Sequence, residues 1–379
     1  MEEFTNSTGM KIFYGAIALF MIGFSLFLFN MDHSKAGNGV LAIPVIFVIL
    51  ALVILVSQFK RKIIISADSI VSINAFGRKE LPTADVKGCR INQKTISIEP
   101  ISSSSPKIVI NNYSDLSSSD DLVTWLNTNF IDLDTSDLKE EHAKVLNDTS
   151  LGFTEEEREQ KLIRAKRISM AYNICGSVLL FLGIFLRSNY TTTVMLLIYP
   201  LAGILLMVFS NGLIRFASDS KKSAYPFIFV GFMLPAFALL LKSFDYQIYK
   251  YNNIWTPFLA YGLVIFFLLY TKGLSSGMPV KPQLIFMIIF SFIYAYGSTT
   301  LLNCTFDKSK PQIIHTSIYT IDIRQSKGTH YYLYLKSWDS DPKPKSIEVS
   351  TRTFYRYPIG SDIDVHLKKG LLNIPWYYL

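Results

Sequence analysis

The chain has 379 residues, of which 50% are hydrophobic, 14% aromatic and only 17% charged. Soluble domains average about 25% charged residues, so this composition indicates that much of the chain lies in a membrane. The net charge of +8 does not predict a nucleic-acid-binding face, because many Lys and Arg residues flank apolar stretches, where they act as topology signals. The three cysteines are scattered and form no CxxC pair, which argues against a disulfide framework or a zinc site.

Seven uncharged apolar stretches organise the sequence. They lie near residues 12–30, 40–58, 168–186, 192–210, 225–241, 254–271 and 283–302. A hydrocarbon core of roughly 30 Å is crossed by about 20 helical residues. The sequence therefore predicts a polytopic α-helical membrane protein with seven transmembrane helices, arranged as an N-terminal hairpin (1–59) and a five-helix bundle (168–302).

The flanking charges predict an orientation for these helices. Residues 1–10 are acidic and no small-residue cleavage site follows them, which favours a retained first helix over a cleaved signal peptide. Lys and Arg are more frequent in the segment 59–167 and in the other loops on its side of the membrane. The positive-inside rule then places the N-terminus in the cytoplasm, and seven crossings place residues 303–379 outside.

Residues 60–133 have the pattern of a small β domain closed by a helix. Strands are predicted at Lys62–Ala67, Ser69–Ala75, Pro82–Asn92, Thr95–Glu99 and Lys107–Ile110, with a turn at Asn74–Lys79. Leu122, Trp125, Leu126 and Phe130 recur at helical spacing, and Ser117–Asp120 supply N-cap candidates.

The order of these elements after two membrane helices resembles the pleckstrin-homology-like (PH-like) domains of bacterial membrane proteins. The resemblance is carried by Ile63–Ile70, Gly77–Pro82, Asp85-Val86 and the helix at 120–130. It implies a split β-barrel that docks proteins or lipids rather than a catalyst, and a bacterial inner membrane as its location. Arg78 and Lys79 are candidate partner contacts, because the strand loops carry no dense basic cluster of the kind that reads phosphoinositides.

A charged linker, residues 134–167, leads to the third apolar stretch. Thr154 and Glu157 fit a capping box that opens a helix running into the membrane. The basic end of that helix is a candidate contact for anionic lipids, formed by Arg158, Lys161, Arg164, Lys166 and Arg167. The alternative is a topology signal whose side chains snorkel to the interface.

The apolar stretches themselves hold no Asp, Glu, Lys, Arg or His. Proton relays and ion paths commonly use such residues, so their absence from these stretches argues against an ion-coupled transporter. A site for a neutral or apolar solute remains open near Pro200, Pro235 and the tyrosines of the seventh stretch. The alternative for the polar side chains there is helix packing.

Residues 303–379 predict a small extracytoplasmic β domain. Strands are expected at Gln312–Ile323, Thr329–Trp338, Ser346–Ser350 and around Ile363–Leu367, and the apolar C-terminal end is expected to join a sheet. Trp376 is a candidate partner contact, with a core position as the alternative. His315, His330 and His366 have no zinc-type spacing, and no nucleotide loop or nucleophile elbow is present.

These observations predict a non-enzymatic membrane scaffold or sensor with no cofactor. It would link a cytoplasmic docking domain to an extracytoplasmic β domain, with membrane lipids and other membrane or envelope proteins as partners and no nucleic acid. The alternative is a transporter or channel component for a neutral or apolar solute, and a lipid-acting membrane enzyme is a third, weaker hypothesis.

Overall fold

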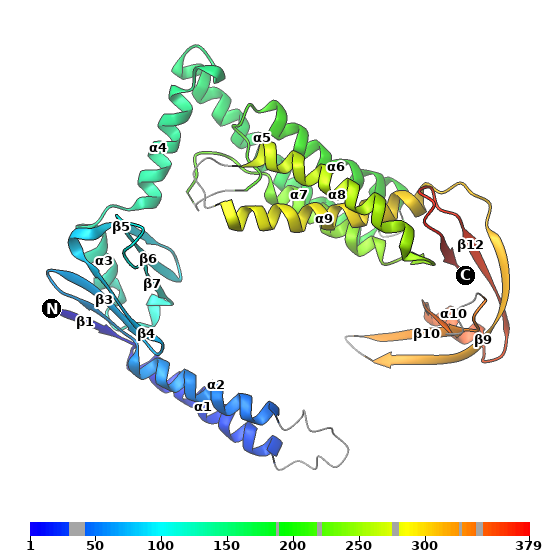
Figure 1. The fold of residues 1–379 in the computed structure, drawn as a ribbon, viewed down its shortest axis with the longest axis horizontal. Helices are drawn as coiled ribbons and strands as arrows, with labels where there is room; N and C mark the ends of the chain where they lie inside the picture. Colours follow the sequence, from blue (N-terminus) through cyan, green and yellow to red (C-terminus); the bar gives the residue numbers. More distant parts are fainter. Residues whose placement is uncertain (30–41, 187–188, 218–221, 275–279, 326–327, 339–343) are drawn as a thin grey trace. The chain divides into compact units, whose positions relative to one another are not determined.

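The computed structural model describes residues 1–379 except 30–41, 187–188, 218–221, 275–279, 326–327 and 339–343 (Figure 1). The connection between the first two apolar stretches and parts of the predicted turn and loop at 326–328 and 339–345 therefore lie outside the described residues. The chain divides into two compact units, Met1–Glu140 and Glu141–Leu379.

The first unit contains a nearly closed barrel-like arrangement of two antiparallel sheets. One sheet has the order β1 (Glu2–Thr5), β2 (Lys62–Ile65), β3 (Ser69–Asn74), β4 (Gly77–Pro82); the other has β5 (Val86–Ile91), β6 (Thr95–Pro100), β7 (Ile108–Asn111). Alternate side chains of these strands point inward, so that Ile70, Ile96 and Ile108 are fully buried. Helix α3 (Ser119–Asn129) adds Leu122 and Leu126 to this core and confirms the predicted amphipathic helix.

Strand β1 precedes the helical hairpin α1 (Thr8–Phe29) and α2 (Ala42–Lys60), so the hairpin is an insertion between two paired strands. Asn6 donates to the Gln58 side chain at 2.6 Å, and Arg61 donates to Asn112 O at 3.1 Å. The first bond joins the two ends of the hairpin, and the second ties its C-terminal end to the residue that follows β7. The sequence assigned residues 1–59 to the hairpin alone, because a four-residue strand with only Phe4 buried has too little pattern to be recognised.

The strand boundaries differ from the prediction in two places. The turn is confined to Asn74–Gly77, and Arg78 and Lys79 belong to β4. Only Leu81 of β4 is buried, so the strand has no apolar alternation to predict it. The predicted strand 82–92 is instead a short 3₁₀ turn, Thr83–Asp85, followed by β5.

Two helices follow α3. Helix α4 (Leu133–Asn147) begins at the barrel, where Arg90 holds Asp134 at 2.6 Å and Asp137 at 2.6 Å. Helix α5 (Glu155–Phe185) confirms the continuous charged-to-apolar helix. Thr154 caps it by accepting from Glu157 N, while Glu157 Oε2 accepts from Phe153 N at 2.9 Å, a variant of the predicted capping box.

In the described residues, five helices are long and apolar enough to cross a membrane: Thr8–Phe29, Glu155–Phe185, Tyr190–Phe209, Tyr251–Gly273 and Gln283–Thr305. The other two predicted spans correspond to shorter apolar helices, Pro44–Lys60 and Phe229–Ser243. The apolar helices of the second unit are α5, α6 (Tyr190–Phe209), α7 (Phe229–Ser243), α8 (Trp255–Gly273) and α9 (Val280–Thr305).

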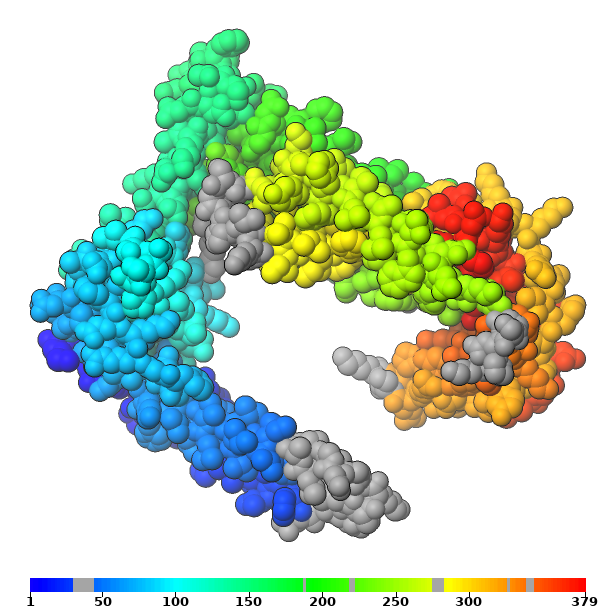
Figure 2. Space-filling model, in the orientation of Figure 1, coloured from blue at the N-terminus to red at the C-terminus, as the bar shows by residue number. Residues whose placement is uncertain are grey.

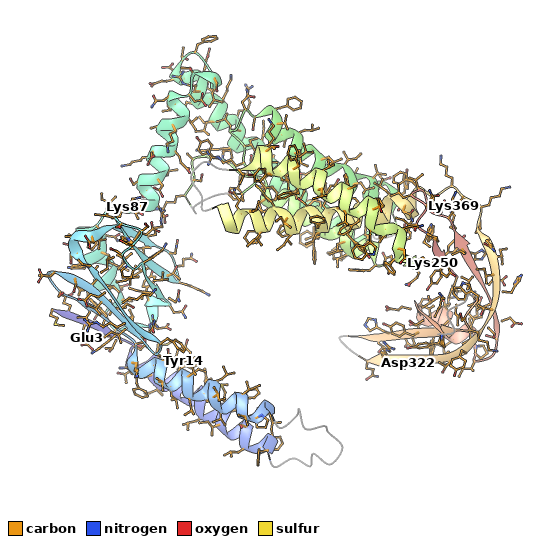
Figure 3. The ribbon with its side chains drawn as sticks, viewed as in Figure 1. Glu3, Tyr14, Lys87, Lys250, Asp322 and Lys369 are labelled. Carbon is orange, nitrogen blue, oxygen red and sulfur yellow. The ribbon has the colours of Figure 1, made fainter. Side chains whose placement is uncertain are left out.

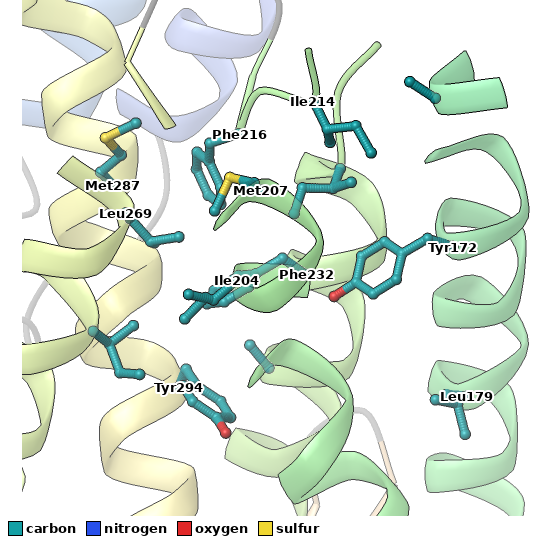
Figure 4. Packing of buried hydrophobic residues seen from close by; sticks show 14 of the residues in the cluster. Tyr172, Leu179, Ile204, Met207, Ile214, Phe216, Phe232, Leu269, Met287 and Tyr294 are labelled. Atoms are coloured by element: carbon teal, nitrogen blue, oxygen red, sulfur yellow. The ribbon is translucent and has the colours of Figure 1, made fainter. Parts of the chain in front are cut away.

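Helix α7 lies at the centre of this bundle, against α5, α6 and α9. Its Phe232 is fully buried beside Phe216 and Tyr294, as Figure 4 shows. Gly231 faces Gly176 of α5 so closely that a Cβ on Gly176 would lie 2.6 Å from Gly231 Cα. Small residues therefore let the two helix backbones touch.

The C-terminal region forms a six-stranded antiparallel sheet with the order β11-β10-β9-β12-β13-β8. Its strands are β8 (Gln247–Ile248), β9 (Gln312–Gln325), β10 (Thr329–Leu335), β11 (Lys345–Val349), β12 (Asp362–Lys368) and β13 (Trp376–Tyr378), and α10 (Thr351–Arg356) packs on it. The strands predicted after residue 303 are present, and the C-terminal end joins the sheet as expected. Strand β8 comes from the α7–α8 connection, so this sheet includes a piece of the bundle.

Candidate functional site

The basic half of α5 combines a buried stripe with exposed cations. Arg158, Leu162, Ala165, Ser169 and Tyr172 are buried at helical spacing. The cations between them, Lys161, Arg164, Lys166 and Arg167, are exposed. No carboxylate in the described part of the chain forms an ion pair with any of these four. This end of the apolar helix therefore presents four unneutralised positive charges.

Arg158 does not belong to this group, and its predicted lipid contact is wrong. Its side chain is 7% exposed, and Nη1 donates to Gly152 O at 2.8 Å. Arg158 lies one helical turn before Leu162 on the same buried stripe, which turns it away from the surface. It fixes the turn that precedes α5 instead.

Two grooves flank the buried stripe of α5. The first has a volume of about 290 Å³ and is lined by Lys161 and Arg164 together with the apolar Ile168, Leu206 and Phe209. The second has a volume of about 450 Å³ and is lined on the other side of α5 by Lys166, Ser169, Asn173 and the segment 223–227. No Asp or Glu lines either groove. Each groove thus joins a cationic rim to an apolar wall.

A second polar cluster joins the end of α9 to the C-terminal sheet. Asn303 is fully buried; its Nδ2 donates to Ile374 O at 2.8 Å, and its Oδ1 accepts from Leu372 N at 2.9 Å. Asp307 accepts from the Trp376 indole and from Gly370 N, both at 2.9 Å. Burial alone would raise the pKa of Asp307, but hydrogen bonds from Ser309, Trp376 and Gly370 lower it.

Trp376 is therefore part of the fold and not an exposed partner contact. It is 9% exposed, pairs with Ile248 across β13 and β8, and packs against Tyr246. In Figure 2 the C-terminal residues, in red, lie against the end of the bundle. The alternative core reading of Trp376 is the one that the structure supports.

Arg78 and Lys79 lie on β4 and are exposed. Arg78 forms an ion pair with Glu80 at 2.7 Å, and Lys79 donates to Lys107 O at 3.3 Å. The neighbouring turn ends in Phe76, which is 85% exposed. A contact between this hairpin and a partner stays a prediction.

Two of the three histidines of the C-terminal region form separate exposed pairs with carboxylates, and His366 stacks on Tyr378 instead. His315 contacts Asp364 at 2.6 Å and His330 contacts Glu348 at 2.7 Å. Among the residues that the structure describes, no three His, Cys, Asp or Glu side chains are grouped so that they could hold a metal ion.

The sequence pattern identified Asn173 as a polar residue within an apolar stretch but did not identify Ser169, Asn303 or Asp307. Asn303 bonds to Ile374 and Asp307 to Trp376, about 70 residues away along the chain, so no local spacing identifies them. The available signal was weak: Asn303 is an amide that directly follows an apolar stretch.

Comparisons with protein-family models, curated proteins and solved structures found no match.

Proposed function

We propose that the chain is a non-enzymatic scaffold or sensor of a cell membrane, with seven spans in a two-plus-five arrangement. The barrel-like unit would be a cytoplasmic PH-like docking domain, and the C-terminal sheet would be an extracytoplasmic recognition domain. The four free cations of α5 would contact anionic lipids on the cytoplasmic side.

The observation that carries this proposal is the continuity between the C-terminal sheet and two helices. Strand β8 follows α7 and pairs with β13, while Asn303 and Asp307 at the end of α9 hold residues 370–376. A partner that displaced the sheet would therefore also displace the ends of α7 and α9. Such a device requires two states that the partner binds with different affinity.

The seven-span count is supported by the path of the short helix α7. With 15 residues α7 is about 22 Å long, less than a hydrocarbon core of roughly 30 Å. Before α7, Ile228 N bonds to Arg215 O beyond the end of α6; after α7, β8 joins the C-terminal sheet. At that same sheet end, Tyr190 at the start of α6 contacts Phe306. Helices α6 and α7 thus connect the same two ends of the bundle.

Photo-crosslinking in cells tests the scaffold. Benzoylphenylalanine would replace Phe76, which is 85% exposed, or Tyr355, which is 71% exposed. We expect discrete protein adducts at both positions, and lipid adducts alone at the control position Phe20 on α1, which is 73% exposed. A background level of protein adducts at both Phe76 and Tyr355 would contradict the scaffold proposal.

One observation favours the alternative, a transport component for a neutral solute. Gln283 of α9 is 2% exposed, and neither atom of its amide has a hydrogen-bond partner within the described chain. Buried amides are normally paired. If solute uptake depends on this group, Gln283→Leu abolishes it; unchanged uptake excludes this amide as a solute ligand.

A further inference from the structure

The groove beside Lys166 is polar at one end and apolar along its wall. Lys166, Ser169 and Ser223 line the polar end, and Met170, Ile174 and Val230 line the apolar wall. Asn173 and Ser177 of α5 also line the groove. Met170 is 66% exposed and Ile174 is 55% exposed, so the wall is continuous with the outer apolar face of α5. The groove therefore opens toward the surface of an apolar helix rather than into a separate chamber.

Two polar contacts hold the walls of the groove together, and two more hold its rim residues to α4. Asn173 Nδ2 donates to Phe227 O at 2.8 Å, and its Oδ1 accepts from Gly231 N at 2.7 Å. Glu141 Oε2 accepts from Ser223 Oγ at 2.7 Å and from Ala224 N at 2.8 Å. The groove is thus preformed, which lowers the entropic cost of binding.

The Tyr225 ring on this rim is also fixed. The guanidinium carbon of Arg215 lies 3.3 Å from the centre of that ring. A cation over an aromatic face at this distance is attracted by the ring quadrupole. The rim residue is therefore ordered before any ligand arrives.

Two hydrogen-bond donors at the polar end have no partner. The Ser169 hydroxyl is buried in a residue that is 2% exposed and makes no hydrogen bond to the described chain, whereas Ser177 on the same helix donates to Asn173 O. Lys166 forms no ion pair with any described carboxylate. The two residues are three apart and share one face of α5. An ammonium and a hydroxyl so placed match an anionic, acceptor-rich group.

We propose that this groove binds one anionic phospholipid, with its phosphate at Lys166 and Ser169 and one acyl chain along Met170, Ile174 and Val230. The proposal rests on the membrane placement proposed above and names a ligand for the basic end of α5. A phospholipid fits better than a soluble anion, because it would contact both the charged end and the apolar wall. A small ion would occupy the charged end only. The wall also continues along α5 to the exposed Val178.

Photo-labelling of the full chain in lipid nanodiscs tests this assignment. The probe is phosphatidylglycerol with a diazirine on one acyl chain, diluted in phosphatidylcholine, and the adducts are mapped by mass spectrometry. We expect adducts concentrated in residues 166–177 and 223–230. Ile174→Trp fills the groove and lowers this labelling by roughly fivefold. Ile184→Trp, at a position 47% exposed on the same helix, leaves it unchanged.

A matched pair of variants tests the selectivity of the groove for an anionic headgroup. Lys166→Gln removes the charge that lines the groove, and we expect it to lower labelling by the phosphatidylglycerol probe roughly fivefold relative to a phosphatidylcholine probe. Arg167→Gln removes the neighbouring exposed charge, which does not line the groove, and preserves the preference.

Three results would overturn the proposal. Labelling spread over all apolar helices in proportion to exposure would show that no site exists. Equal labelling by the anionic and neutral probes would remove the headgroup selectivity. Displacement of the probe by inorganic phosphate would assign the site to a small anion instead. Failure of the chain to enter nanodiscs at all would contradict the membrane placement itself. That outcome is distinct from a chain that enters nanodiscs but shows no labelling of the groove.

Discussion

At the residue scale, Arg90 is the main electrostatic link between the barrel and α4. Its guanidinium contacts Glu99 at 3.2 Å, Asp134 at 2.6 Å and Asp137 at 2.6 Å, and Asp134 is 6% exposed. Burial would lower the pKa of Arg90, but the hydrogen bonds to Asp134 and Asp137 raise it. Three carboxylates on one planar cation form a network whose removal leaves a buried negative charge.

We therefore predict that Arg90→Gln opens this part of the barrel. The cost is about 2–3 kcal/mol, because Asp134 loses its counter-ion. The neighbouring Cys89 thiol reports the opening: it is 1% exposed, and burial together with Asp132 and Asp134 raises its pKa to about 11. Alkylation of Cys89 should accelerate by one to two orders of magnitude, roughly matching that cost. The control Arg78→Gln breaks only an exposed ion pair with Glu80, and faster alkylation there as well would refute the role of Arg90.

Asp307 gives the second residue-scale prediction, a pH dependence of the junction between α9 and the sheet. Its folded-state pKa is lowered, so its stabilisation is present above the unfolded pKa and is lost as the pH falls through the folded value. Both carboxylate oxygens accept hydrogen bonds, from Ser309 N and from Trp376 and Gly370. Asp307→Asn cannot satisfy all three donors, so it should cost about 1–3 kcal/mol at neutral pH and remove the acid dependence.

Hydrogen exchange of residues 370–378 measures this effect. Exchange should rise in the wild type at acid pH and be raised at all pH values in Asp307→Asn. The control Asp322→Asn changes an exposed carboxylate on the β9–β10 hairpin, labelled in Figure 3, and should leave the exchange unchanged. An acid-independent exchange rate in the wild type would contradict the prediction.

Candidate residues whose environment depends on local helical spacing could be placed from the sequence. Those whose partners lie far along the chain could not. The exposed positions of Lys161 and Arg164 follow from helical spacing alone. The same spacing, extended back from Leu162, places Arg158 on the buried stripe, so this error was avoidable. Trp376 differs, because its partner Asp307 is 69 residues away and only the sheet brings the two together.

At the element scale, the contact between α5 and α7 depends on glycine. A Cβ on Gly176 would lie 2.6 Å from Gly231 Cα and 2.7 Å from its carbonyl oxygen. Both obstacles are backbone atoms, which cannot rotate away. The two helices can approach this closely only because neither residue carries a side chain.

Gly176→Ala should therefore force α5 and α7 apart and destabilise the bundle by about 1–3 kcal/mol. The control Gly15→Ala lies on α1 with no atom within 4 Å of the added Cβ, and should be neutral or slightly stabilising. Thermal unfolding of the full chain in a neutral detergent compares the two. Equal melting temperatures for both variants would show that the bundle absorbs the added methyl group.

Elements with a long uniform pattern were predictable from the sequence, and short ones were not. Helix α5 has 31 residues, a capping threonine and a continuous buried stripe, so its extent follows from the sequence. Strands β1 and β8 have four and two residues, and each exists because a partner strand far along the chain supplies its hydrogen bonds. Such strands are products of tertiary structure rather than of local propensity.

At the scale of the whole molecule, the sheet end of the bundle collects three chain segments. The end of α7, the start of α8 and the end of α9 meet there, since Asn253 donates to Asn373 O and Asn303 to Ile374 O. Helices α7 and α9 thus run in the same direction with α8 returning between them. The side of the membrane on which the sheet lies therefore tests how many of these helices cross it.

The last prediction is that the two β domains face opposite compartments. Native Cys89 and Cys304 are buried and respond poorly to labelling, so exposed reporters are needed: Ser103→Cys on the β6–β7 loop and Thr329→Cys on β10, in a background without native cysteines. A membrane-impermeant maleimide should label Thr329→Cys in intact cells and Ser103→Cys only after permeabilisation, because the basic loops favour the cytoplasmic side. Labelling of both in intact cells, or of neither, would place the domains on one side. One of the two short helices would then not cross, and signalling across the membrane through α7 and α9 would be excluded.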